Sequence, residues 1–236
     1  MATSEAGERS VRIPVTGGFI DGSLLAPAAP SGLVVIAHGS GSSRFSRRNR
    51  QVAGALVAAG FAVLLLNLLT QEEEPVDALT GRIRFDIPLL GRRVVAAIDW
   101  AGTSEQVRRL PLACFGASTG AAAALVAAAC RPDVVRAVVS RGGRPDLAGA
   151  ALADVDAATL LLVGEADPDV LALNREAMRR MRCYSELVVV PGASHLFEEP
   201  GALDLVCRHA VDWCRRFLTP APSTSTPVRT SGAPPS

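Results

Sequence analysis

A serine in a glycine-flanked turn is the residue of this chain whose surroundings most clearly favour chemistry. Ser118 lies in Gly116-Ala-Ser-Thr-Gly120, after the apolar run 110–115 and before the alanine-rich run 121–130. A Gly-x-Ser-x-Gly turn between a strand and a helix strains the serine backbone, and the glycines let strand and helix approach each other. The turn lifts the hydroxyl above the sheet, so the pattern predicts that Ser118 is a nucleophile.

A histidine near the end of the chain is the candidate base. A serine hydroxyl is a weak nucleophile at neutral pH unless a base takes its proton. His195 follows the apolar run 186–190 in the loop Pro191-Gly-Ala-Ser-His195, at the place where such a base is needed. The alternative is a loop histidine with a structural hydrogen bond. Of the other two histidines, His38 is expected to shape a Gly/Ser loop, and His209 lies within an amphipathic helix.

An aspartate after another apolar run is the candidate partner of this base. The base needs an acceptor on its second ring nitrogen, which fixes its tautomer and stabilises the imidazolium. Asp167 ends the segment Gly164-Glu-Ala-Asp167, directly past the apolar run 159–163. Glu165 and Asp169 remain alternatives, although Asp169 also suits the N-terminus of a helix, where a carboxylate is favoured.

Two backbone N–H groups are expected to hold the negative charge that develops on a carbonyl oxygen under attack. One belongs to Thr119, the residue after the nucleophile. The other comes from the loop that follows the apolar run 33–37, where Ser40 is the first choice and Gly39 or Gly41 the alternatives. Each donor is worth about 3 kcal/mol of transition-state stabilisation. Because the backbone carries this role, the side chain of Ser40 is expected to matter little.

The elements that must position these residues alternate between apolar strands and helices. Such alternation predicts an α/β fold with a mostly parallel sheet and helices on both faces. A Gly17-Gly18 turn predicts an antiparallel N-terminal hairpin. Residues 69–81 are predicted to be a polar, acidic connection, and 141–157 a segment of small residues. The predicted strands are 11–15, 19–26, 33–37, 61–66, 110–115, 134–139, 159–163 and 186–190, and the predicted helices are 46–59, 83–101, 119–131, 171–181 and 202–218.

Length and composition predict one globular domain. The chain has 236 residues, 49% of them hydrophobic, and a net charge of +1, which gives no reason to expect a nucleic-acid partner. No apolar run reaches the roughly 20 residues of a membrane span, and residues 1–10 do not resemble a secretory signal, so a cytoplasmic location without membrane contact is expected. We expect a flexible N-terminus over 1–10, the domain over 11–218, and a disordered Pro/Ser/Thr-rich tail over 219–236.

The cysteines and the basic residues argue against several cofactors. Five cysteines without a Cys-x-x-Cys pair indicate reduced core thiols rather than disulfides or zinc. All 24 basic residues are arginine, and the absence of lysine excludes a Walker A phosphate loop, a pyridoxal Schiff base and a Ser-Lys dyad. No Gly-x-Gly-x-x-Gly follows a strand, which argues against a dinucleotide. We therefore expect neither a metal nor an organic cofactor.

Across about Val11 to Leu218, the chain resembles the dienelactone-hydrolase-like branch of the α/β-hydrolases. The resemblance rests on His38-Gly-Ser-Gly-Ser-Ser-Arg44, Asn67-Leu-Leu-Thr70, Gly116-Ala-Ser-Thr-Gly120, Gly164-Glu-Ala-Asp167 and Ser194-His-Leu-Phe-Glu-Glu-Pro200. True dienelactone hydrolases use a cysteine nucleophile, whereas the elbow here holds Ser118. The resemblance thus implies an α/β-hydrolase fold and favours a serine esterase over a dienelactone substrate. Only about 19 residues separate 139 from 159, too few for a large lid.

The leading hypothesis is a carboxylesterase-type serine hydrolase acting on small or short-chain esters through an acyl-enzyme. Lactone hydrolysis and acyl transfer remain alternatives, because the same residues serve all three reactions. A non-catalytic binding protein on a hydrolase scaffold is the alternative from another class. The expected partner is a small-molecule ester or lactone, and the sequence leaves the oligomeric state open.

Arginines near the expected cleft suggest how a substrate carboxylate would be bound. Arg44 follows the Gly/Ser loop, and a guanidinium binds a carboxylate through two parallel hydrogen bonds. We therefore predict Arg44 as a substrate-binding residue. Arg82, Arg84 and Arg141 lie on connections that could also reach the cleft, but a solvated surface position is the stronger expectation for each of them.

Overall fold

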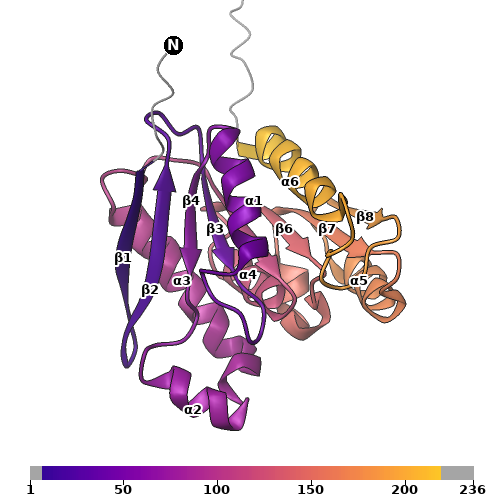
Figure 1. Ribbon diagram of the computed structural model, residues 1–236, viewed down its shortest axis with the longest axis horizontal. Helices are drawn as coiled ribbons and strands as arrows, with labels where there is room; N and C mark the ends of the chain where they lie inside the picture. Colours follow the sequence, from indigo (N-terminus) through magenta and orange to yellow (C-terminus); the bar gives the residue numbers. More distant parts are fainter. Residues whose placement is uncertain (1–6, 219–236) are drawn as a thin grey trace, which may run out of the picture.

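The computed structural model describes residues 7–218, which form one eight-stranded sheet with the strand order β1-β2-β4-β3-β5-β6-β7-β8 (Figure 1). The antiparallel pairs are β1 with β2 and β2 with β4, and every other neighbouring pair is parallel. This topology confirms the predicted α/β-hydrolase class with an N-terminal hairpin. The strands are β1 (Gly7–Val15), β2 (Gly18–Ala26), β3 (Leu33–Ala37), β4 (Ala62–Leu66), β5 (Leu112–Ala117), β6 (Val135–Arg141), β7 (Ala158–Gly164) and β8 (Ser185–Val190).

The N-terminal strand begins earlier than predicted. Gly7 pairs with Ala26, and the register continues without interruption to Val15 and Gly18. The expectation of a flexible segment over 1–10 is therefore wrong for residues 7–10, because the backbone of β2 offers them hydrogen-bond partners although their side chains are exposed. Residues 1–6 and the predicted tail 219–236 lie outside the described residues.

Helices cover both faces of the sheet, because the strands are apolar on both sides. Within β3, Val34 and Ile36 pack on the face covered by α1 and α6, while Leu33 and Val35 pack on the opposite face. Successive side chains of a strand point to opposite faces, so a strand buried on both sides has to be continuously apolar. Figure 1 shows α1 and α6 on one side and α3, α4 and α5 on the other. The helices are α1 (Arg47–Ala58), α2 (Glu73–Thr80), α3 (Ile87–Thr103), α4 (Thr119–Cys130), α5 (Pro168–Arg180) and α6 (Ala202–Leu218), with short 3₁₀ helices η1 (Ile83–Phe85) and η2 (Pro145–Asp154).

The helix α2 corrects the prediction that residues 69–81 form a polar connection. Its Pro75 lies in the first turn, where a missing N–H costs little because those N–H groups have no partner within the helix. The helix ends at Thr80, and the capping residue Gly81 that follows has a left-handed φ of 64°. Thr70 and Glu73 tie its start together, since the N–H of Thr70 donates to the Glu73 carboxylate and the N–H of Glu73 to the Thr70 hydroxyl.

The parallel strands bring the predicted site residues to one edge of the sheet. The strands β3, β5, β6, β7 and β8 run in the same direction, so the loops that follow them meet at their carboxyl ends. Between β6 and β7 the chain adds only η2, as expected for a protein without a large lid at this position. Across residues 7–218, no helix combines the length and the apolar character needed to cross a membrane.

Candidate active site

Ser118 occupies the strained turn that its motif predicts. Its φ of 49° and ψ of −121° fall outside the regions that non-glycine residues ordinarily adopt. The strain is maintained on both sides, because the Ser118 N–H donates to the Arg141 carbonyl at 3.2 Å and the Ser118 carbonyl accepts from the N–H groups of Ala121 and Arg144, both at 3.1 Å. The serine that carries the hydroxyl is therefore held by a fixed backbone at the carboxyl end of β5.

The two flanking glycines are required by close approach. A Cβ on Gly116 would lie 2.3 Å from the Cα of Ala121, in the first turn of α4. A Cβ on Gly120 would lie 2.4 Å from the carbonyl oxygens of both Ala37 and His38, at the end of β3. Real Cβ atoms essentially never come so close, so the elbow depends on glycine at both places.

His195 and Asp167 are joined by a hydrogen bond. The Nδ1 of His195 lies 2.7 Å from Oδ2 of Asp167, whose side chain is only 15% exposed. Glu165, the alternative carboxylate, makes a different contact. Its Oε2 accepts from the N–H of Gly192 at 2.8 Å and so ties down the loop that carries His195. Asp169 lies in the first turn of α5. The geometry thus supports Asp167 as the residue that orients the histidine.

Ser118 and His195 line the same cleft at this edge of the sheet. The cleft has a volume of about 210 Å³. It is lined by Gly39, Ser40, Ser42, Arg48, Ala117, Ser118, Arg141, His195 and Leu196. The structure therefore gathers the predicted nucleophile, the predicted base and the predicted loop after β3 around one space.

The two predicted backbone donors lie beside the nucleophile. A Cβ on Gly39 would lie 3.0 Å from the Cβ of Ser118, so the loop after β3 passes directly over the elbow. Ser40 lines the cleft, and both Ser40 and Thr119 line the adjoining cavity. This placement suits N–H groups that act on a carbonyl oxygen held at Ser118.

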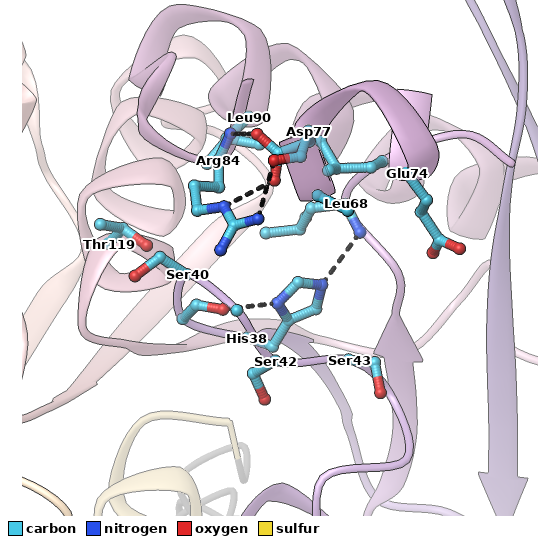
Figure 2. Close-up of a pocket in the computed structure, with 14 residues that line it drawn as sticks. His38, Ser40, Ser42, Ser43, Leu68, Glu74, Asp77, Arg84, Leu90 and Thr119 are labelled. Atoms are coloured by element: carbon cyan, nitrogen blue, oxygen red, sulfur yellow. Dashed lines mark hydrogen bonds and ion pairs between the residues drawn. The ribbon is translucent and has the colours of Figure 1, made fainter. Parts of the chain in front are cut away.

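The adjoining cavity is larger and mostly apolar. It has a volume of about 290 Å³ and opens between the loop after β3 and the wall made by α2 and η1 (Figure 2). Leu68, Leu69 and Leu90 supply apolar wall, and Arg84 supplies a polar group. Arg84 is held in place by Asp77, which accepts from its Nε at 2.6 Å. The cavity thus offers an apolar pocket next to the predicted reaction centre.

His38 shapes the loop, as the sequence predicts. Its Nδ1 lies 2.8 Å from the Gly39 carbonyl oxygen, and its Nε2 accepts from the N–H of Leu68 at 3.2 Å. Figure 2 shows both contacts. Burial lowers the pKa of His38 from its ordinary value, which favours the neutral ring that can accept this hydrogen bond.

Arg44 does not lie where a substrate clamp was expected. Its guanidinium lies 3.5 Å from the Asp21 carboxylate on β2 and 4.4 Å from the centre of the Phe45 ring. It lines neither the cleft nor the adjoining cavity, so the structure gives no support to its predicted contact with substrate. The attraction of Asp21, which precedes Arg44 by 23 positions, turns the side chain away, and a local motif gives no sign of such a partner.

Sequence reasoning ranked two other arginines as surface residues, and the structure places both at the site. Arg84 lines the adjoining cavity, and Arg141 lines the cleft with only 8% of its surface exposed. The sequence signal that could have found Arg141 was its position, because it lies two residues past the predicted strand 134–139.

The described part of the chain also shows where possible metal ligands and the cysteines lie. Within residues 7–218, no group of three His, Cys, Asp or Glu side chains is placed to hold a metal ion. The five cysteines are free thiols. Cys114, Cys207 and Cys214 are buried as predicted, whereas Cys130 is exposed at the end of α4 and is not a core thiol.

Comparisons with known proteins identify the family and the fold. Residues 20–212 match the model of the dienelactone hydrolase family. The crystal structure of a dienelactone hydrolase from Anabaena variabilis is 51% identical, with a TM-score of 0.89 over 91% of this chain and 99% of that one. The structure of Est1E from Butyrivibrio proteoclasticus is 16% identical, with a TM-score of 0.73 over 88% of this chain and 98% of its own. At that identity the likeness concerns the fold alone.

A curated relative is about twice as long as the matching region. A protein of Mycobacterium tuberculosis, named provisionally as a phosphoribosyl transferase, is 51% identical over 225 residues. The match covers 94% of this chain but 50% of that protein. The chain therefore spans about half the length of the curated relatives it matches.

Proposed function

Because the chain belongs to the dienelactone hydrolase family, we propose that it hydrolyses carboxylic esters of small or short-chain acids through an acyl-enzyme on Ser118. The observation that carries the proposal is the strained serine of the elbow, which shares one cleft with a histidine that is hydrogen-bonded to a partly buried aspartate. A non-glycine residue at positive φ costs of the order of 1–3 kcal/mol and persists where the surroundings enforce it. A protein that only binds a ligand would have no use for that strain, which argues against the binding-module alternative.

The proposed reaction follows from the placement of the groups. Ser118 Oγ attacks the ester carbonyl while Nε2 of His195 takes its proton, and Nδ1–H of His195 donates to Asp167 throughout. The N–H groups of Thr119 and Ser40 hold the oxyanion of the tetrahedral intermediate. His195 then returns the proton to the leaving alcohol. Water, activated by the same histidine, releases the acid and regenerates Ser118.

The cavity beside the elbow supports a small acyl or alcohol group. Its volume of about 290 Å³ lies at the lower end of the range for ligand pockets. Leu68, Leu69 and Leu90 favour an aliphatic or aromatic group. We therefore infer that turnover falls as the acyl chain outgrows this space.

Two related reactions use the same residues and stay alternatives. A lactone is an internal ester, and an acyl-enzyme can pass its acyl group to an acceptor other than water. The name of the mycobacterial relative refers to a protein of which this chain covers 50%, so it provides no assignment for these residues. The five free thiols support a reducing compartment such as the cytoplasm, which we include in the proposal.

Hydrolysis of p-nitrophenyl esters from acetate to dodecanoate tests the proposal. The wild type is expected to prefer short chains, and Ser118→Ala to lose at least about 10⁴-fold in kcat/KM. Ser42→Ala is the matched control, since Ser42 lines the cleft but has no place in the proposed mechanism. Equal turnover by Ser118→Ala and the wild type would rule out Ser118 as the nucleophile. Hydrolysis of lactones, or faster turnover with an added alcohol, would identify the alternatives.

A further inference from the structure

Arg141 places a buried positive charge beside the predicted nucleophile. It is the last residue of β6, and its backbone carbonyl accepts the N–H of Ser118 at 3.2 Å. Its surface is 8% exposed, and it lines the cleft that Ser118 and His195 share. Arg141 therefore borders the space that Ser118 and His195 share, and its side chain is largely shielded from water.

This guanidinium has no partner among residues 7–218. Its Nη1 is buried without a hydrogen bond, and no carboxylate of the described chain forms an ion pair with it. Arg93 provides the comparison, because it is also buried, at 3% exposure, but pairs with Glu73 at 2.7 Å and also donates to the Thr16 carbonyl. Buried charges are costly and are normally paired, so an unpaired one next to a reaction centre calls for a partner that arrives from outside.

A second guanidinium adds positive charge to the same cleft. Arg48, in the first turn of α1, lines the cleft and has a buried Nε without a partner, while its Nη1 pairs with Glu198 at 2.7 Å. Burial, followed by repulsion from Arg48, lowers the pKa of Arg141 to about 10. Arg141 is therefore still charged at neutral pH. Glu198 is the one carboxylate paired with these two arginines in the described chain, so positive charge is in excess.

We propose that Arg141, assisted by Arg48, binds an anionic oxygen group carried by the ester substrate, either a carboxylate or a phosphate monoester. The inference deepens the proposed function and rests on it. A guanidinium donates two parallel hydrogen bonds to such a group, which fixes the substrate's orientation relative to Ser118. Esters that lack the anion leave the buried guanidinium unpaired and are selected against.

Pairs of esters with and without an anionic group test this site. The carboxylate arm compares 4-acetoxybenzoate with its methyl ester, and p-nitrophenyl hemiglutarate with its methyl ester, so the anion is on the alcohol side or the acyl side. The phosphate arm compares 4-acetoxyphenyl phosphate with phenyl acetate. In at least one pair the wild type is expected to favour the anionic ester, and Arg141→Met to lose about 10- to 100-fold on it, with less than about threefold on the neutral ester.

Three further variants separate substrate binding from structure. Arg48→Met is expected to show a smaller loss of the same selectivity, and Arg141→Lys to retain part of it, because a lysine keeps the charge but not the fork. Arg92→Met is the matched control, since Arg92 is exposed on α3 and lines neither cavity. It removes the same charge and should leave the selectivity unchanged. If Arg141→Met does not fold, the selectivity of Arg141→Lys and Arg48→Met for anionic over neutral esters is compared with that of the wild type instead.

Some outcomes would overturn the proposal. A wild type without preference for the anion in any pair, or an equal loss on charged and neutral esters in Arg141→Met, would leave Arg141 with a structural role only. Calorimetric titration with glutarate and with inorganic phosphate provides a test independent of turnover. Binding by the wild type that Arg141→Met loses supports the anion site even if no ester is hydrolysed, in which case the proposed function alone fails. Absence of binding of both anions to the wild type contradicts the site.

Discussion

Replacing Gly120 by alanine should disrupt the elbow through a contact that can be measured on the structure. The added Cβ would lie 2.4 Å from the carbonyl oxygens of Ala37 and His38, and both belong to backbone that cannot rotate away. The start of α4 and the end of β3 would have to separate until these contacts exceed 3.0 Å. Overpacking of this kind costs about 1–3 kcal/mol, and two simultaneous backbone contacts place Gly120→Ala at the upper end of that range.

The same displacement should reduce the rate. The loop after β3 carries the predicted donor Ser40, and the start of α4 carries Thr119. A change of geometry near 1 Å at reacting groups can cost about 100-fold. We therefore expect Gly120→Ala to lose about 3 kcal/mol in free energy of unfolding, measured by urea titration, and about 100-fold in kcat for p-nitrophenyl acetate.

Gly54→Ala is the matched control for this substitution. Gly54 is exposed within α1, and a Cβ there would meet no atom within 4 Å. Alanine in a helix interior is favoured over glycine by roughly 0.5–1 kcal/mol, so Gly54→Ala should raise the free energy of unfolding and leave kcat unchanged. Wild-type stability and rate in Gly120→Ala would refute the argument that close approach at β3 requires this glycine.

Three further predictions concern the groups around the elbow. Asp167→Asn should lower kcat by about 10⁴-fold because the histidine loses its orienting carboxylate. Glu165→Gln can still accept from the loop backbone, so its kcat should stay within a few-fold of that of the wild type. Equal losses of esterase activity in the two variants would contradict the assignment of Asp167. Burial lowers the pKa of His38 below its ordinary value of 6.5, so the unfolded chain binds a proton that the folded one resists. The contribution of His38 to the free energy of unfolding should therefore be fully retained above about pH 6.5. Below that pH, this group should lower the free energy of unfolding by at most about 1.4 kcal/mol per pH unit. Chemical denaturation at pH 7 and at pH 5 should show a smaller decrease in the free energy of unfolding for His38→Gln than for the wild type. Asp77→Asn should loosen the wall of the cavity, since that carboxylate accepts from two backbone N–H groups and one guanidinium, and should raise KM for longer acyl chains more than it lowers kcat; an unchanged KM would contradict its positioning role.

Most of the fold follows from the periodicity of the sequence, and the exceptions have physical causes. Strands such as β3 and β4 are continuously apolar because both faces are covered, which makes them easy to recognise. The helix α2 was not predicted, because its acidic start and Pro75 are typical of a loop as well as of a first helical turn. The first residues of β1 were not predicted, because their side chains are exposed and only pairing with β2 makes them a strand.

The residues of the candidate site likewise fall into those that the sequence predicts and those that it does not. Ser118, Asp167 and His195 are predictable as candidates because each lies in the turn or loop that follows a strand, and parallel strands bring such loops together. The arginines are not predictable in this way, because the direction of a long side chain depends on partners that are distant in the sequence. Arg44 pairs with Asp21 and lines neither cavity, whereas Arg141 is buried at the end of β6 and lines the cleft.

Detection of an acyl group on Ser118 tests the central claim most directly. The wild type would be mixed with p-nitrophenyl butyrate, quenched in acid within the first turnovers, digested and examined by mass spectrometry. The account predicts a butyryl group on the peptide that contains Ser118. With an ester reactive enough to acylate His195→Ala, that variant should carry the acyl group on a larger fraction of its Ser118 peptide, because the loss of the histidine slows deacylation. Steady turnover with no adduct on that peptide, or an adduct on another residue, would contradict the acyl-enzyme mechanism.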